Sequence, residues 1–152
     1  MSDAAMIVAG AIACLGLSGA GSALGTGLAA SAAVGAWKKC YAANKPAPFL
    51  LLTFVGAPIT QTLYGMILMF TMLGKVGKVA AGSGVPVLVA GIFAGLAIGL
   101  SALFQGRAAA AACDAQAETN QGFTNYFAAI GIVETVAIFA MVFALIALGS
   151  VK

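Results

Sequence analysis

Four long apolar runs limit how this chain can fold. They cover residues 4–36, 49–74, 86–112 and 123–149. A helix needs about 20 mainly apolar residues to cross the hydrocarbon core of a membrane, and every run is long enough. Only 7% of the 152 residues are charged, whereas a typical soluble domain carries about 25%. The sequence therefore predicts an all-α membrane protein with four transmembrane helices.

The connections between these runs predict two helical hairpins, residues 1–78 and 79–152. The connecting residues are rich in Pro, Gly and polar side chains, which favour turns and loops. An even number of spans places both termini on one side. The first and third loops, residues 37–48 and 113–122, lie on the side with more Lys and Arg, so we expect them to be cytoplasmic. The apolar N-terminal run has no basic residue before Lys38, so we expect a retained membrane helix rather than a secretory signal.

The two predicted hairpins are related in sequence. Placing Gln61 over Glu134 aligns APITQTLYGMILMF with IGIVETVAIFAMVF, and placing Thr26 over Gln105 aligns GTGLAASAA with FQGRAAAAA. The first and third spans are rich in Gly, Ala and Ser, which let helices pack closely in lipid. The second and fourth spans carry most of the Phe and Tyr residues. This alternation suits a ring with the slim helices inside, although a simple four-helix bundle would also use these contacts.

Few polar side chains occur at membrane depth. Glu134 is the acid inside the fourth run, and a charge there costs roughly 3 kcal/mol on insertion scales. The midpoint between Gln105 and Glu134 falls in the turn-forming ETNQG segment, so these two residues are expected to face each other in an antiparallel hairpin. The second run adds Thr60, Gln61 and Tyr64 just after Pro58, which leaves backbone carbonyls near residues 54–57 without their helical partner.

These groups predict a cation site. A carboxylate, two amides and a hydroxyl all offer oxygen, the donor that hard cations prefer. A single formal charge suits a monovalent ion better than calcium, so sodium fits best, with Tyr64 donating to Glu134. The chain has no His, and its three Cys lack CxxC spacing, which argues against His-based catalysis and metal clusters. Its charge of +3 includes no long basic run, so nucleic acid is not an expected partner.

Three motifs resemble the proteolipid (c or K) subunit of the membrane rotor ring of V-type and A-type rotary ATPases. They are PITQTLYG at 58–65, FQGRAAAA at 104–111 and VET at 133–135. The resemblance covers the chain in a duplicated-hairpin form and is greatest to bacterial sodium-translocating members. It implies that Glu134 carries the ion and that Tyr64 bonds to it. It also implies a Na⁺ ligand set of Thr60, Gln61, Gln105, Glu134 and the backbone carbonyl of Ala57.

The resemblance also implies partners. Copies of the chain would form a homo-oligomeric ring in lipid, in a bacterial plasma membrane. A stator subunit would contribute an essential arginine, and central-stalk subunits would bind loops 37–48 and 113–122. ATP hydrolysis in the peripheral sector would turn the ring, so the chain would not be an enzyme on its own. Because Gln61 aligns with Glu134, each chain would carry one ion.

Other interpretations of the sequence are open at this point. The same ring could carry H⁺, which needs fewer oxygen ligands than Na⁺. A small membrane enzyme, such as a glutathione-dependent transferase, would need more cationic groups near the spans than Arg107. An exporter or structural protein would act as a dimer. Arg107 is expected to reach toward the interface, and Asp114 and Glu118 are expected to be solvated loop charges.

Overall fold

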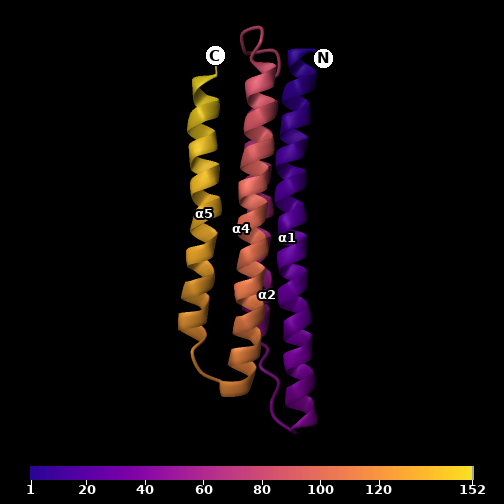
Figure 1. Ribbon diagram of the computed structural model, residues 1–152, viewed down its shortest axis with the longest axis vertical. Helices are drawn as coiled ribbons and strands as arrows, with labels where there is room; N and C mark the ends of the chain where they lie inside the picture. Colours follow the sequence, from indigo (N-terminus) through magenta and orange to yellow (C-terminus); the bar gives the residue numbers. More distant parts are fainter. Residues whose placement is uncertain (152) are drawn as a thin grey trace.

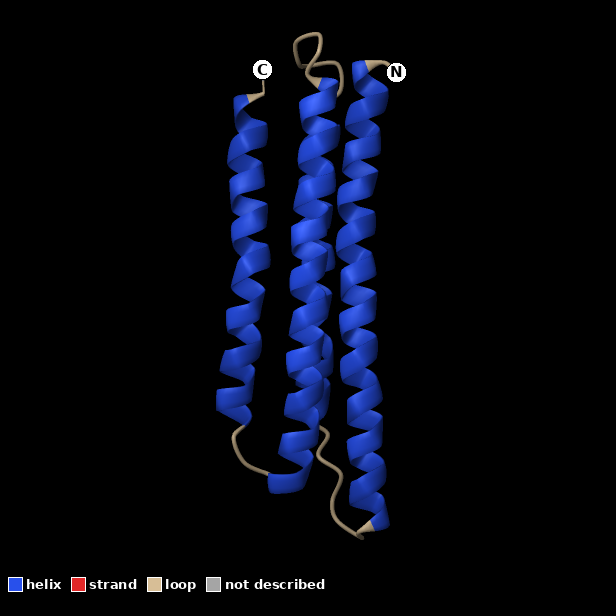
Figure 2. Cartoon of the chain, viewed as in Figure 1, coloured by secondary structure: helices blue, strands red, loops and turns tan. Residues whose placement is uncertain are grey.

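The computed structural model describes residues 1–151 and is helical throughout, with no strand in that range (Figures 1 and 2). The helices are α1 (Asp3–Ala42), α2 (Leu51–Gly56), the 3-10 helix η1 (Ala57–Ile59), α3 (Thr60–Leu73), α4 (Gly84–Thr119) and α5 (Phe123–Ser150). The segments α2, η1 and α3 follow one another without a break and act as one span. Four spans result, each long and apolar enough to cross a membrane. The predicted all-α fold with four candidate spans is confirmed.

The spans run along the long axis of the molecule. Figure 1 shows both termini at one end, together with the connection between α3 and α4. The α1–α2 and α4–α5 connections lie at the opposite end. In that view α4 stands between α1 and α5, while the α2–α3 span lies behind α4 and contacts both α1 and α4. This arrangement brings residues of α3, α4 and α5 together at mid-length.

Glycines allow α1 and α4 to pack backbone against backbone. A Cβ atom on Gly21 would collide with the backbone of Gly99, and one on Gly106 would collide with the backbone of Gly25. Small residues are the usual means by which membrane helices approach so closely. The α1–α4 pair is therefore the most tightly packed part of the chain, as the Gly-rich pattern predicts.

Two predicted loops are helical over their first half or more. We expected loops at residues 37–48 and 113–122, but α1 continues to Ala42 and α4 to Thr119. Those expectations relied on the Pro and polar residues of the two connections, whereas the Ala, Lys and Gln residues at 37–42 and 113–119 favour helix in water. The turn into α5 is short and uses the left-handed conformations of Asn120 and Gly122.

Asp114 and Glu118 are solvated, as expected, but they lie on a helix and in ion pairs rather than in a loop. Both lie on α4, where Lys39 of α1 approaches Asp114 at 2.8 Å and Glu118 at 3.5 Å. The three side chains are more than half exposed, and exposed pairs of this kind contribute at most about 1 kcal/mol. The ion pairs therefore join the projecting ends of α1 and α4 without deciding the fold.

Candidate ion-binding site

The site begins at the change of helix type in the second span. Pro58 has no backbone N–H, and the chain tightens into η1, where the Thr60 amide bonds to the carbonyl of Ala57. The Thr60 hydroxyl lies 3.1 Å from the same carbonyl oxygen. The short 3-10 turn thus gathers a backbone oxygen and a side-chain oxygen inside the span.

The carboxylate of Glu134 is held by side chains from two other helices. Its Oε1 atom accepts hydrogen bonds from the Thr60 hydroxyl and the Tyr64 hydroxyl, each at 2.6 Å. Its Oε2 atom accepts one from Gln105 Nε2 at 3.2 Å. Thr60 and Tyr64 are four residues apart, so they share one face of α3. Short bonds to a charged acceptor are the strong kind, and they fix the carboxylate against α3 and α4.

Two glutamines complete the network. Gln61 Nε2 donates to Gln105 Oε1 at 2.7 Å, and both side chains are fully buried. Gln105 Nε2 also donates to the carbonyl of Ile130 at 3.2 Å. Gln105 therefore turns its amide nitrogen toward Glu134, and its oxygen already accepts from Gln61. As a cation ligand, Gln105 would share this oxygen between the ion and Gln61.

The Thr60 hydroxyl is surrounded by more oxygens than it has hydrogens. Its oxygen lies near Glu134 Oε1 (2.6 Å), the Ala57 carbonyl (3.1 Å) and Gln61 Oε1 (3.2 Å). A hydroxyl has one hydrogen to donate, and the short distance to the carboxylate shows where it goes. The other two oxygens then face the hydroxyl without a proton between them. Such a group of oxygens is chemically suited to a hard cation.

The formal charge of the site is small. Glu134 supplies the single carboxylate, and the remaining oxygens are neutral. Within residues 1–151, no group of three or more His, Cys, Asp or Glu side chains gathers as a metal site. One negative charge balances one positive charge, so a monovalent cation would make the site neutral.

All of the sequence-predicted site groups meet in this network, but two neighbouring contacts to the backbone of α5 were not predicted. Ser101, one turn before Gln105 on α4, donates to the Val133 carbonyl at 2.9 Å, and the Ile130 carbonyl accepts from Gln105. The spacing of Ser101 and Gln105 could have indicated a shared face. Ser101 lies in a stretch of small residues, however, where serine usually serves close packing.

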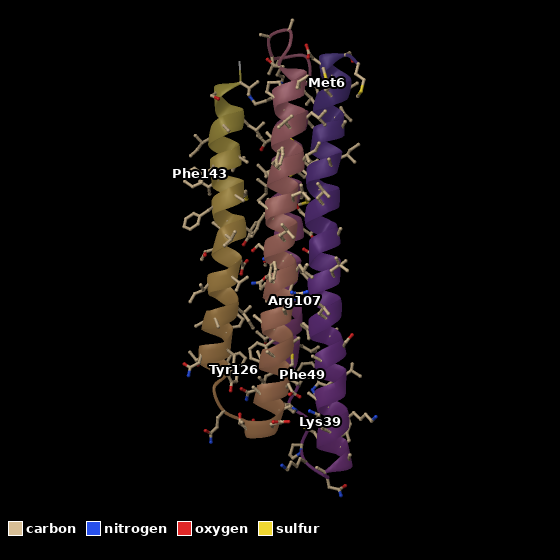
Figure 3. All side chains as sticks on the ribbon, in the orientation of Figure 1. Met6, Lys39, Phe49, Arg107, Tyr126 and Phe143 are labelled. Carbon is tan, nitrogen blue, oxygen red and sulfur yellow. The ribbon has the colours of Figure 1, made fainter. Side chains whose placement is uncertain are left out.

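Arg107 lies outside the network. It is exposed on α4, and its guanidinium carbon lies 5.2 Å from the centre of the Phe104 ring. Figure 3 places it at mid-length of the bundle, well away from the labelled Lys39 near the loop end. The stacking on Phe104 satisfies part of the charge through a cation–π contact.

Comparison with known proteins identifies the second hairpin. Residues 82–147, less than half of the chain, match the family model that describes the C subunit of ATP synthase. No curated protein sequence matches the chain. The matched segment contains all of α4 and most of α5, including Gln105 and Glu134. Members of this family are membrane rotor subunits that assemble into homo-oligomeric rings and take part in ion transport. Together with the four apolar helices, the match indicates an integral, multi-pass membrane protein whose second hairpin is similar to the C subunit of ATP synthase.

Proposed function

We propose that this chain is the rotor-ring subunit of a V-type ATPase and carries Na⁺ across a membrane on Glu134. Copies of the chain would form the ring, and ATP hydrolysis in the peripheral sector would turn it. The family match to the second hairpin supports the rotor role. The related first hairpin supplies the remaining site residues, which supports a duplicated subunit with one ion site for its four spans.

The group of oxygens around the Thr60 hydroxyl carries the sodium assignment. Glu134 Oε1, the Ala57 carbonyl and Gln61 Oε1 all lie within 3.2 Å of that hydroxyl oxygen. A proton would need only the carboxylate and one acceptor. A cation can take electron density from every oxygen in the group, including the two that receive no hydrogen from the Thr60 hydroxyl. Bound sodium would therefore use more of the oxygens gathered at the site than a bound proton would.

The same contacts suggest how Glu134 can be carried through lipid. With a monovalent cation bound, the site is neutral and avoids the cost of a bare charge in hydrocarbon. When the cation leaves, Thr60, Tyr64 and Gln105 can each donate to the carboxylate and keep it from swinging into the membrane. Release would then take place beside the stator, where a fixed arginine would compete for the carboxylate.

The two ends of the spans would face opposite sides of the membrane. The central stalk would bind the projecting ends of α1 and α4 and the connections after them, on the cytoplasmic side of a bacterial plasma membrane. Both termini would lie on the opposite side. Gln61 occupies the position in the first hairpin that Glu134 occupies in the second. An uncharged amide there leaves one ion-carrying carboxylate for each chain.

Labelling by a hydrophobic carbodiimide tests the choice of ion. The reagent attacks the protonated form of a carboxyl group within the membrane. We expect the purified oligomer to be labelled at Glu134 and sodium to slow the reaction at constant pH, while equal potassium has little effect. Labelling that is equally fast at every sodium concentration would favour the same ring carrying H⁺. A dimer rather than a many-copy particle in detergent would contradict the rotor itself.

A further inference from the structure

Within this chain, α5 is held much more loosely than α4. Three of its 28 residues are buried, whereas fifteen of the 36 residues of α4 are. A Cβ atom added at Gly131 would point into open space, so this face of α5 near Glu134 is free of contacts with the other helices. Figure 3 shows Phe143 pointing outward from the bundle. Apolar contacts of Ile130, Ala137 and Leu148 seat one face of α5 on the bundle. The turn between Ile130 and Ala137, which carries Glu134, has no buried side chain of its own.

Hydrogen bonds from the other helices hold the turn of α5 that carries Glu134. Within residues 1–151, five side-chain hydrogen bonds join α5 to other helices, and all of them end between Ile130 and Glu134. Three of the five end on the Glu134 carboxylate itself. Those three must change whenever the carboxylate binds or releases an ion. The other two end on the backbone carbonyls of Ile130 and Val133, which are not part of the Glu134 carboxylate.

The two carbonyl contacts are not equivalent. Gln105 bonds to the Ile130 carbonyl at 3.2 Å, but it also bonds to Glu134 and Gln61, so its amide belongs to the ion site. Ser101 makes a single hydrogen bond, from Oγ to the Val133 carbonyl at 2.9 Å, and is only 5% exposed. A helix carbonyl has a second lone pair free for such a bond. Of the two, the Ser101 contact is therefore the one that shares no atom with the candidate ion site.

We propose that Ser101 is a positioning residue that fixes the rotation of α5 and so keeps Glu134 in the cation site during ion exchange. The proposal rests on the function proposed for Glu134. Val133 directly precedes Glu134, so a contact on its carbonyl restrains the helix turn that carries the carboxylate. Residues of this kind, which orient a ligand without touching the ion, commonly alter metal affinity when they are removed.

The test compares Ser101→Ala with Ser22→Ala in the purified oligomer. Ser22 is equally buried, at 5% exposure, but its hydroxyl has no hydrogen-bond partner within the described residues. We expect Ser101→Ala to raise the sodium Kd by about three- to twentyfold, the span that measured interhelical hydrogen bonds in membranes and orienting contacts would give. Ser22→Ala should leave the Kd unchanged. Ser101→Cys keeps a small side chain with a weak donor and should recover part of the affinity.

The melting temperature of each oligomer separates positioning from general stability. Our proposal expects Ser101→Ala to melt close to the parent while its sodium Kd rises. A lower melting temperature with an unchanged Kd would show Ser101 to be ordinary interhelical packing and would overturn the proposal. A Kd that changes no more than that of Ser22→Ala would also overturn it.

A sodium-independent readout separates this inference from the ion assignment. If the parent binds no sodium, the sodium function fails, and the carbodiimide labelling of Glu134 is followed against pH in sodium-free buffer instead. Loss of the Ser101 contact should shift the labelling midpoint by about half a pH unit or more, which corresponds to the same threefold effect. Coincident profiles for the parent, Ser101→Ala and Ser22→Ala would refute a positioning role for Ser101.

Discussion

Thr60→Val removes the hydroxyl at the centre of the oxygen group while changing little else. Threonine and valine are both β-branched and close in volume, so the backbone at the start of α3 should keep its conformation. The three oxygens that lie within 3.2 Å of Thr60 Oγ1 would remain, but the atom that they surround would be gone. If these oxygens bind a cation together, the loss must appear in the sodium affinity.

The magnitude follows from two opposing effects. Interactions between a polar group and a charge are worth about 1.5–3 kcal/mol, and the loaded site loses one of them. The ion-free site also loses one, because Thr60 donates to Glu134 Oε1 at 2.6 Å. Partial cancellation leaves a difference of about 1.4 kcal/mol, which is a tenfold rise in the sodium Kd. Sodium protection against carbodiimide labelling of Glu134 measures this shift at constant pH.

The matched control is Thr135→Val. Thr135 adjoins Glu134 in sequence, but its hydroxyl bonds to the Ile132 carbonyl at 2.7 Å on an exposed part of α5. We expect this variant to need the same sodium concentration as the parent for half-protection. If the parent is protected by sodium and Thr60→Val is protected at that same concentration, Thr60 is not a ligand and our interpretation of the oxygen group is wrong.

Two further changes probe the tyrosine contact to Glu134 and the packing of α1 on α4. Tyr64→Phe removes the hydroxyl that donates to Glu134 Oε1 at 2.6 Å. We expect the sodium Kd, measured by equilibrium binding, to rise several-fold while the oligomer stays intact. An unchanged Kd would show that the hydroxyl does not hold the carboxylate. Gly21→Ala should destabilise the chain by about 1–3 kcal/mol, because the new Cβ meets the Gly99 backbone. Gly27→Ala is the control, because its Cβ points into open space. Equal melting temperatures of the two variants in thermal unfolding would contradict the close α1–α4 contact.

The side chains that meet around Glu134 were largely predictable because lipid leaves few choices. A lone acid at Glu134 demands partners, and the polar residues available at that depth are few. The hairpin geometry then determines which residues can meet: the midpoint between Gln105 and Glu134 falls on a turn, so the two residues face each other. In the structure the Gln105 amide nitrogen and the Glu134 carboxylate are 3.2 Å apart.

Other features depend on information that hydropathy does not carry. The helical extensions through Lys39 and Asp114 carry exposed charges, and helix propensity and ion pairs decide their conformation. The Ser101 contact to the Val133 carbonyl depends on the relative rotation of α4 and α5. A serine among small residues gives no sign of which backbone oxygen it will meet. The orientation of the Gln105 amide likewise depends on competing donors and acceptors that come together only when three helices are assembled.

Binding of radioactive sodium to the purified oligomer, with the parent and Glu134→Gln measured side by side, tests the central claim most directly. Glu134→Gln keeps the shape of the side chain but removes the charge that balances the cation. We predict saturable binding of one sodium ion per chain for the parent and none for the variant. Equal binding by both proteins, or no binding by a correctly assembled parent, would contradict the assignment of Glu134 as the sodium carrier.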